Sequence, residues 1–280
     1  MAERADIDSV RTVYETVHEK LVSAGRTHDQ WGLRHGFYEA DVSEEAAATK
    51  RMRDAMLDRV ELDAEDHVLD IGCGFGTSSI WLADTVGATV TGTNIVRDQL
   101  TIARELADRR DVSDAVEFLE DDFHRLSIDE SAVDVVWACE ALCYAHRIER
   151  VLAELDRVLT DGGRLVVADL FRVTERGRTC EHVAEFENCW KSTIAHRDDI
   201  VELLTDRGFE TTVTDVTPHV RLTIERRYRY GLSLRPLQRF RYNLGRCDET
   251  DVEYARGLIA EHRAVDRGTL RYFLITAERR

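Results

Sequence analysis

The sequence predicts an α/β fold in which helices flank a doubly wound, mostly parallel sheet of about seven strands. Short β-branched runs alternate with stretches of helical periodicity from about residue 65 onward, which is typical of βαβ units. The first of those strands ends in a glycine-rich turn that opens a helix. A helical segment precedes this core, and Pro218 to Arg267 is too long for a hairpin turn, so we expect a helical insertion that covers a site.

Two helices are expected before the sheet, because apolar residues recur at helical spacing from Ile7 to Leu21 and from Met52 to Val60. The expected strands are His67–Ile71, Thr89–Asn94, Val116–Leu119, Val133–Cys139, Leu165–Asp169, Thr211–Val216 and Leu270–Thr276. The expected helices are Thr77–Val86, Asp98–Arg110, Ile148–Leu159, Thr179–Ala195 and a helix through Leu204 that Asp198 or Asp199 caps. A turn is expected at Asp161-Gly162-Gly163.

Composition restricts the setting of the chain. Its 280 residues are 43% hydrophobic, which is enough for a buried core, yet no run of about 18 apolar residues could span a membrane. The N-terminus lacks the apolar stretch of a signal peptide, so we expect a cytoplasmic protein. The six cysteines contain no CxxC pair, which argues against a disulfide framework or a zinc site. We therefore expect reduced thiols and no metal.

Charge restricts the partners. The net charge is −16, and such a field repels nucleic acid phosphates and anionic membranes. We therefore expect neither nucleic acid binding nor stable membrane insertion. The only lysines are Lys20, Lys50 and Lys191, and a carboxylate-rich, lysine-poor surface suits high salt, where screening weakens self-repulsion. An ordinary acidic bacterial protein is the alternative, and nothing in the sequence indicates an oligomeric state.

The strongest local signal is the segment Val68-Leu69-Asp70-Ile71-Gly72-Cys73-Gly74-Phe75-Gly76-Thr77. An apolar strand runs into a turn with glycine at every second position, where a ligand can approach the backbone. The helix that follows directs its N–H groups at that ligand. We expect Asp70, Gly72, Cys73, Gly74 and Gly76 to bind a cofactor in a Rossmann-like core.

The spacing of these glycines differs from the dinucleotide fingerprint, which requires glycine where this chain has Thr77. The Asp70 carboxylate would also repel a pyrophosphate, whereas it suits the positively charged end of a methionine-like ligand. Both points favour S-adenosyl-L-methionine over NAD. An NAD-dependent oxidoreductase remains the alternative.

Three residues at the ends of the next strands are expected to contact the nucleoside. Asn94 lies 22 residues after Gly72, about where a ribose-binding carboxylate belongs, and its amide can donate and accept hydrogen bonds. Asp122 can accept from the adenine amino group, and Phe123 can flank the ring. The alternatives are a turn-forming asparagine and a solvated acidic turn.

With these residues the chain resembles the class I S-adenosylmethionine-dependent methyltransferases over roughly residues 10–170. It is most similar to the group of sterol and tocopherol C-methyltransferases and sugar O-methyltransferases. Three segments carry this likeness: Trp31-Gly32-Leu33-Arg34-His35-Gly36-Phe37-Tyr38, Gly92-Thr93-Asn94-Ile95 with Gln99, and Trp137-Ala138-Cys139-Glu140-Ala141-Leu142-Cys143-Tyr144. The last resembles the Glu-Ala-x-Cys-His segment of sterol methyltransferases, with Tyr144 in place of histidine.

The resemblance implies further roles. Ile95, Gln99 and Glu140 would contact the cofactor, and Trp31, Phe37 and Tyr38 would admit an apolar substrate. We divide the chain accordingly into N-terminal helices with the loop that admits substrate (1–60), a cofactor-binding core (61–170), and the remaining strands with a helical lid (171–280).

The catalytic candidates are Glu140, Tyr144, Asp169 and His35. The first three lie at the carboxyl ends of two predicted strands, where α/β sheets bind ligands. Glu140 could act as a base or stabilise a developing cation, or it could only anchor the cofactor. Tyr144 could orient the substrate or be a packed core aromatic, Asp169 could act in catalysis or cap a helix, and His35 could be a base or form a structural hydrogen bond.

The sequence therefore predicts methyl transfer from S-adenosyl-L-methionine to a carbon or oxygen of a small, largely apolar molecule, such as an isoprenoid or quinone. N-methylation of a small amine and a regulator that binds the cofactor without catalysis remain open. The sequence does not identify the acceptor.

Overall fold

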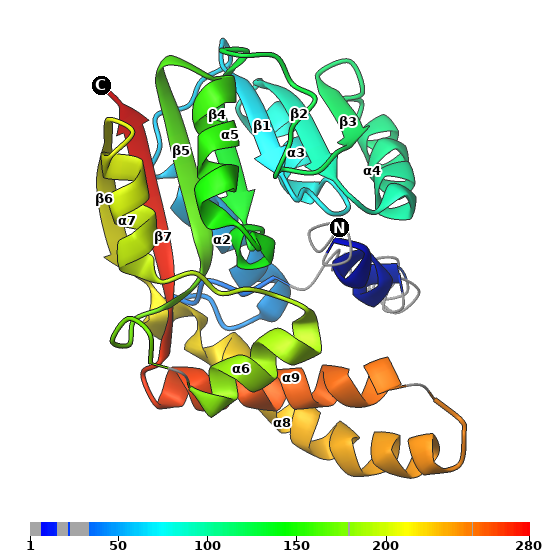
Figure 1. Ribbon diagram of the computed structural model, residues 1–280. Helices are drawn as coiled ribbons and strands as arrows, with labels where there is room; N and C mark the ends of the chain where they lie inside the picture. The colour runs from blue at the N-terminus through cyan, green and yellow to red at the C-terminus, as the bar shows by residue number, and fades with distance from the viewer. Residues whose placement is uncertain (1–6, 16–21, 23–33, 179, 248) are drawn as a thin grey trace.

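Seven strands form one sheet in the computed structural model, which describes residues 7–15, 22, 34–178, 180–247 and 249–280 (Figure 1). Their spatial order is β3-β2-β1-β4-β5-β7-β6, and only β7 runs antiparallel to its neighbours. The strands are β1 (His67–Ile71), β2 (Thr89–Asn94), β3 (Val116–Glu120), β4 (Val133–Cys139), β5 (Leu159–Arg172), β6 (Phe209–Asp215) and β7 (Leu270–Arg279). The predicted α/β fold with a doubly wound sheet is confirmed.

Helices cover both faces of the sheet and continue below its carboxyl edge (Figure 1). Residues 7–15 are helical, as predicted. The other helices are α2 (Glu45–Leu57), α3 (Thr77–Thr85), α4 (Arg97–Arg109), the short 3-10 helix η1 (Leu142–Tyr144), α5 (Ile148–Val158), α6 (Glu181–Trp190), α7 (Arg197–Thr205), α8 (Thr217–Asn243) and α9 (Glu249–Asp266).

The core follows from the alternation of side chains along each strand. Val68 and Trp137 point to the face that α2 and α3 cover, whereas Leu69 and Val136 point to the face that α5 and α7 cover. Because both faces are buried, β1 and β4 are apolar throughout apart from a few polar positions. One of those positions is Asp70, which therefore needs a polar partner inside the protein.

Two boundary predictions were wrong. The chain makes no separate turn at residues 161–163, because β5 begins at once after α5 and Gly162, with φ of 73°, lies in a bulge where the register with β4 shifts. The helix predicted over Thr179–Ala195 is only α6, which ends where Lys191 adopts a left-handed conformation.

The predicted cap of α7 was also wrong. His196 is the N-cap, and its ring accepts a hydrogen bond from the backbone N–H of Asp198. Asp198 and Asp199 lie in the first turn instead, where their charges favour the positive end of the helix dipole.

The predicted insertion after β6 is a long helical hairpin. Pro218 lies in the first turn of α8, where its missing N–H costs no hydrogen bond. α9 returns antiparallel and packs between α8 and α6 below the sheet (Figure 1). Within the described residues no helix is long and apolar enough to cross a membrane, and the six cysteines are free thiols.

Candidate active site

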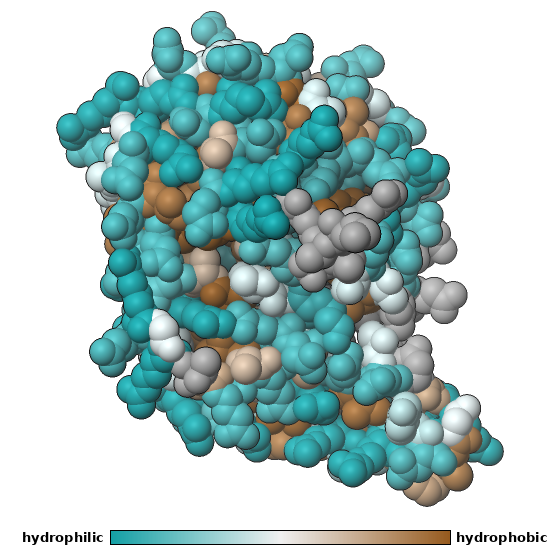
Figure 2. Space-filling model, in the orientation of Figure 1, coloured by the Kyte–Doolittle hydropathy of each residue, from teal (hydrophilic) through white to brown (hydrophobic). Residues whose placement is uncertain are grey.

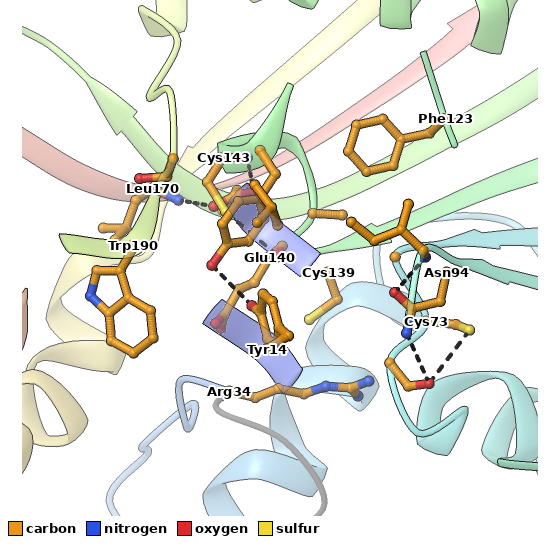
Figure 3. A pocket seen from close by; sticks show the side chains of 18 of the residues that line it. Tyr14, Arg34, Cys73, Asn94, Phe123, Cys139, Glu140, Cys143, Leu170 and Trp190 are labelled. Carbon is orange, nitrogen blue, oxygen red and sulfur yellow. Dashed lines mark hydrogen bonds between the residues drawn. The ribbon is translucent and has the colours of Figure 1, made fainter. Parts of the chain in front are cut away.

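A cavity lies between the carboxyl edge of the sheet and the helices below it. Figure 3 shows its two ends: Cys73, Asn94 and Phe123 line one, and Cys143, Leu170 and Trp190 line the other. The predicted site residues in its lining are Gly72, Cys73, Gly74, Asn94, Ile95, Gln99, Asp122, Phe123, Glu140, Tyr144, Asp169 and His35. Elements far apart in the sequence thus meet at one site.

The three glycines of the loop after β1 differ in what surrounds them, although all three have positive φ. A Cβ on Gly72 would lie 2.9 Å from the Ala141 Cβ, and one on Gly76 would lie 2.5 Å from the Phe118 ring. A Cβ on Gly74 would meet nothing closer than the Gln99 Oε1, at 3.8 Å. Gly72 and Gly76 are therefore required by packing, whereas the space beside Gly74 is open to a ligand.

Asp70 lies beneath this loop and is buried, outside the cavity lining. The Ser79 hydroxyl donates a 2.6 Å hydrogen bond to its Oδ2. Burial raises the pKa of Asp70 to about 6, although Ser79 and the charge of Arg34 oppose the shift. The carboxylate therefore braces the glycine loop against α3 in this structure.

Amide groups line the cavity at the end of β2. Asn94 Nδ2 donates to Gln99 Oε1 at 2.8 Å, and Asn94 Oδ1 accepts from the Ile95 N–H at 3.0 Å. These bonds fix the plane of the Asn94 amide. Asp122 is fixed similarly after β3, because the backbone N–H and the Nδ1 of His124 lie 2.9 and 2.7 Å from its Oδ1.

A buried charge cluster forms part of the cavity lining. His35 Nδ1 lies 3.0 Å from Glu140 Oε1, and His35 Nε2 lies 2.6 Å from Glu261 Oε1. Burial lowers the pKa of His35, but the Glu140 and Glu261 carboxylates outweigh it and raise that pKa to about 9. His35 is therefore an imidazolium held on both sides, which suits the structural hydrogen bond better than a general base.

Glu140 is the centre of this cluster. Its Oε1 accepts from the His35 backbone N–H at 2.7 Å and from the Tyr272 hydroxyl at 2.9 Å. Burial raises its pKa, but the His35 charge and hydrogen bonds dominate and lower it to about 2. Its φ of 56° lies in the left-handed region, a strained conformation for a residue with a Cβ. The end of β4 thus holds an ionised carboxylate at the cavity.

Asp169 lies within β5, three residues before the strand ends, and its carboxyl group has a raised pKa where that of Glu140 is lowered. It is buried, and its two oxygens accept from the Cys143 N–H at 3.0 Å and the Leu170 N–H at 2.8 Å. Burial and the nearby charge of Glu140 raise its pKa to about 7. Near neutral pH this carboxyl group can therefore take up and release a proton.

Tyr144 connects the sheet to the N-terminal helical residues. The Tyr14 hydroxyl donates to the Tyr144 hydroxyl at 2.9 Å, and the two rings meet edge to face (Figure 3). Arg11 Nε also donates to the Ile95 carbonyl at 3.1 Å. Residues 7–15 therefore lie against the cavity, and Ile7, Val10 and Tyr14 belong to its lining.

The predicted substrate residues are placed differently. Phe37 stacks on His219, and the Tyr38 hydroxyl accepts from Arg226, so both pack against α8 and outside the cavity lining. The reason is that hydrogen bonds hold the loop after residue 34 against α8 and α9, from the Gly36 N–H to Thr223 and between His35 and Glu261. Trp31 lies outside the described residues.

Sequence reasoning missed several polar residues of the lining, among them Tyr14, Arg34, Arg227, Glu261 and Tyr272. Arg34 belongs to the Trp31–Tyr38 segment that carried the family likeness, so its position was a usable signal. The others lie on elements whose approach to the cavity depends on tertiary packing.

Comparison with known proteins identifies the family. Residues 69–167 match the family described as "Methyltransferase domain". The methyltransferase GfsG of Streptomyces halstedii is 35% identical over 185 residues, 64% of this chain and 65% of that protein. The 27-O-demethylrifamycin SV methyltransferase of Amycolatopsis mediterranei is 36% identical over 145 residues, 51% of this chain and 53% of that protein. Sterol C-methyltransferases also match, at 25% and 33% identity.

The matched regions thus span between about half and just under two thirds of these first two relatives. Among solved structures, the [4+2]-cyclase SpnF has a TM-score of 0.79 at 24% identity and covers 96% of this chain and 94% of its own. A likeness this remote shows the fold alone. The domain match and the sequence relatives carry the assignment: residues 69–167 of the chain are a methyltransferase domain of the class I S-adenosylmethionine-dependent kind.

Proposed function

We propose that this protein transfers a methyl group from S-adenosylmethionine to the oxygen of a small, apolar molecule that bears a hydroxyl group. The observation that supports this proposal most directly is Asp169, a buried carboxyl group with a pKa of about 7 in the lining of the cavity. A hydroxyl acceptor needs a base of this kind, whereas a carbon acceptor needs stabilisation of a developing cation.

The cofactor end of the cavity fits the donor. The open space beside Gly74 lets the donor approach the backbone of the loop closely. The amides of Asn94 and Gln99 suit the ribose hydroxyls, and the Asp122 carboxylate suits the adenine amino group. Arg34 also lines the cavity and would pair with the carboxylate of the methionine part. When bound, the donor supplies a methyl group already activated by the sulfonium.

The acceptor end fits an apolar molecule. Its lining includes Phe186, Trp190, Leu170 and Leu258. The cations Arg227 and His35 lie within the cluster that holds Glu140 and Glu261, so the described part of the acceptor end offers no concentrated positive charge for an anionic acceptor. An aromatic and aliphatic surface of this kind excludes water from the reacting atoms.

Residues of the chain would have separate roles in the transfer. Asp169 takes the proton of the acceptor hydroxyl while the new C–O bond forms and the S–C bond breaks, with its electron pair left on sulfur. Tyr144 orients the acceptor, and Glu140 positions Tyr272 and the loop of His35. In-line alignment in a dry cavity supplies the remaining acceleration.

The experiment uses cofactor with a labelled methyl group and three probe acceptors: a sterol, a quinol and an aliphatic amine. Label on a hydroxyl oxygen supports the proposal. Label on the amine alone would establish N-methylation, and tight cofactor binding without turnover would indicate a regulator.

Asp169→Asn is the decisive variant. Its kcat is expected to fall by about 10²–10⁴, the usual contribution of a general base, with cofactor affinity unchanged by calorimetry. In the wild type, kcat/KM should rise as the pH rises through about 7, because the carboxylate is the active form. Tyr144→Phe is the comparison, with a smaller loss. Full activity in Asp169→Asn would remove this residue from the mechanism.

A further inference from the structure

The far end of α8 exposes an unusual share of apolar side chains. Eight large apolar side chains are exposed within the described residues, and six of them fall between residues 230 and 244. They are Tyr230, Leu232, Leu237, Phe240, Tyr242 and Leu244. Figure 2 shows apolar atoms among hydrophilic ones at this projecting end. A concentration of this kind on a free surface indicates a binding surface.

The same segment carries the reverse of the overall charge. From Arg226 to Cys247 the sequence contains seven arginines and no aspartate or glutamate, although the whole chain has a net charge of −16. Arg229, Arg235, Arg239, Arg241 and Arg246 are exposed. We call residues 229–246 the arginine arm. Its charge complements an anionic surface, whereas the rest of the molecule repels one.

The position of the arm separates its positive charge from the negative charge of the rest of the molecule. The arm projects from the body as the distal part of the α8–α9 hairpin (Figure 1). At 1.5 Å per residue, the helix from Gly231 to Asn243 extends roughly 18 Å, about twice the Debye length of ~8 Å at physiological salt. A charged surface therefore meets the arm while the field of the acidic body is largely screened. Acidic residues follow the arm in the sequence, among them Glu249, Asp251 and Glu253 at the start of α9.

The pattern of side chains on the arm indicates the kind of partner. Tyr230, Leu237 and Leu244 follow one line at a spacing of seven, whereas Leu232 and Tyr242 lie on other sides of the helix. Arginines stand between them throughout. Two arms packed face to face would bring like charges together, which disfavours pairing with a second copy. A lipid headgroup layer surrounds a helix and accepts both kinds of side chain.

We propose that the arginine arm docks on an anionic lipid bilayer. Its arginines bind lipid phosphates, and Leu237 and Phe240 enter the boundary between headgroups and acyl chains. The two helices of the hairpin that carries the arm also reach the cavity, through Arg227 on α8 and Leu258 on α9. Docking would therefore bring the acceptor end of the cavity near the bilayer, a consequence that rests on the proposed function.

The test is sedimentation of the full chain with vesicles of phosphatidylcholine alone or mixed with phosphatidylglycerol. Binding is expected only to the anionic vesicles, and it should weaken as salt rises. Arg235→Gln/Arg239→Gln/Arg241→Gln and Leu237→Ser/Phe240→Ser should each lower affinity at least about tenfold. The matched control, Arg109→Gln/Arg176→Gln/Arg280→Gln, removes the same charge from exposed arginines of the body and should change binding little.

Three outcomes would overturn the proposal. They are failure to bind anionic vesicles, equal loss in the body control, and a dimer in ultracentrifugation without vesicles that Leu237→Ser/Phe240→Ser converts to monomers. The last would assign the arm to a second copy of the chain. Calorimetry of cofactor binding, which should be unchanged in the arm variants, keeps this result separate from that of the methyl transfer proposal.

Discussion

The two ends of the cavity are built in different ways. Apart from Arg34, the cofactor end comes from one stretch of chain, residues 72–124, and uses glycines, backbone groups and short amide side chains. The acceptor end comes from the N-terminal helical residues, β4, β5, α6, α8, α9 and β7, and uses long side chains joined by buried charge. The first is held by local geometry, and the second depends on tertiary contacts.

This difference teaches where the molecule can vary. A local loop keeps its shape when distant elements change, so the cofactor end tolerates new surroundings. The acceptor end changes whenever α8 or α9 moves, because Glu261 is part of the charge cluster. If this division is correct, substitutions at the acceptor end affect stability, whereas substitutions at the cofactor end affect affinity.

The largest effect is expected for His35→Ala. Removing the imidazolium takes away the group that contacts both Glu140 and Glu261 and leaves the two buried carboxylates with Arg227 as the remaining cation of the cluster, which should lower the free energy of unfolding by about 3–5 kcal/mol. The pKa of His35 is raised from 6.5 to about 9 in the folded protein, so its contribution is fully present below pH 6.5 and is lost as the pH rises through about 9. Urea unfolding of both proteins across this range measures the difference.

His67→Ala is the control for that variant. The His67 ring also makes two hydrogen bonds, to the Ala132 carbonyl and the Thr91 hydroxyl, but it bridges no carboxylates. His67→Ala should lower the free energy of unfolding by about 1 kcal/mol for each hydrogen bond that it removes. Equal losses in the two variants would mean that the charge cluster adds nothing beyond ordinary hydrogen bonds.

Gly74→Val is expected to have the second largest effect, on cofactor affinity. Its side chain would occupy the open space beside the loop, so S-adenosylmethionine should bind at least about tenfold more weakly, or about 1.4 kcal/mol. NAD should not bind either protein. Calorimetry measures both ligands.

Gly162→Val is the control that separates the two effects of Gly74→Val, which are a blocked cofactor site and a strained backbone. Gly162 has φ of 73°, similar to the 57° of Gly74, and a Cβ there would meet nothing within 4 Å. Both variants should lose roughly 1–2 kcal/mol of stability from the left-handed conformation, but only Gly74→Val should lose cofactor affinity. Unchanged affinity in Gly74→Val would contradict the assignment of the loop.

The same division explains what the sequence could predict. Strand periodicity and the glycine spacing located β1, β2 and β4 to the residue, because these signals are local. The bulge at Gly162 was missed, since a glycine pair indicates a turn equally well. The partners of His35 were out of reach, because Glu261 lies 226 residues away and only the packing of α9 brings it there. Asp169 was identified as a candidate, but its raised pKa depends on the burial that the fold produces.

The smallest effect is expected for Asn94→Ala, and it tests whether the cofactor end is truly local. The Asn94 amide bridges the Ile95 N–H and Gln99 Oε1, so it could serve the ribose, the turn, or both. If it serves the ribose, Asn94→Ala should weaken cofactor binding by about 0.5–1.5 kcal/mol, the net value of a hydrogen bond. Asn94→Asp should retain binding, because a carboxylate also accepts from ribose hydroxyls and from the Ile95 N–H.

Thermal unfolding of the two variants without ligand completes the argument. A ribose contact predicts that affinity falls only in Asn94→Ala while both melting temperatures stay close to that of the wild type. An equal, severe loss of affinity in both variants, together with lower melting temperatures, would show that the Asn94 to Gln99 bond holds the turn. In that case even the cofactor end would depend on side-chain packing, and the contrast between the two ends of the cavity would be one of degree.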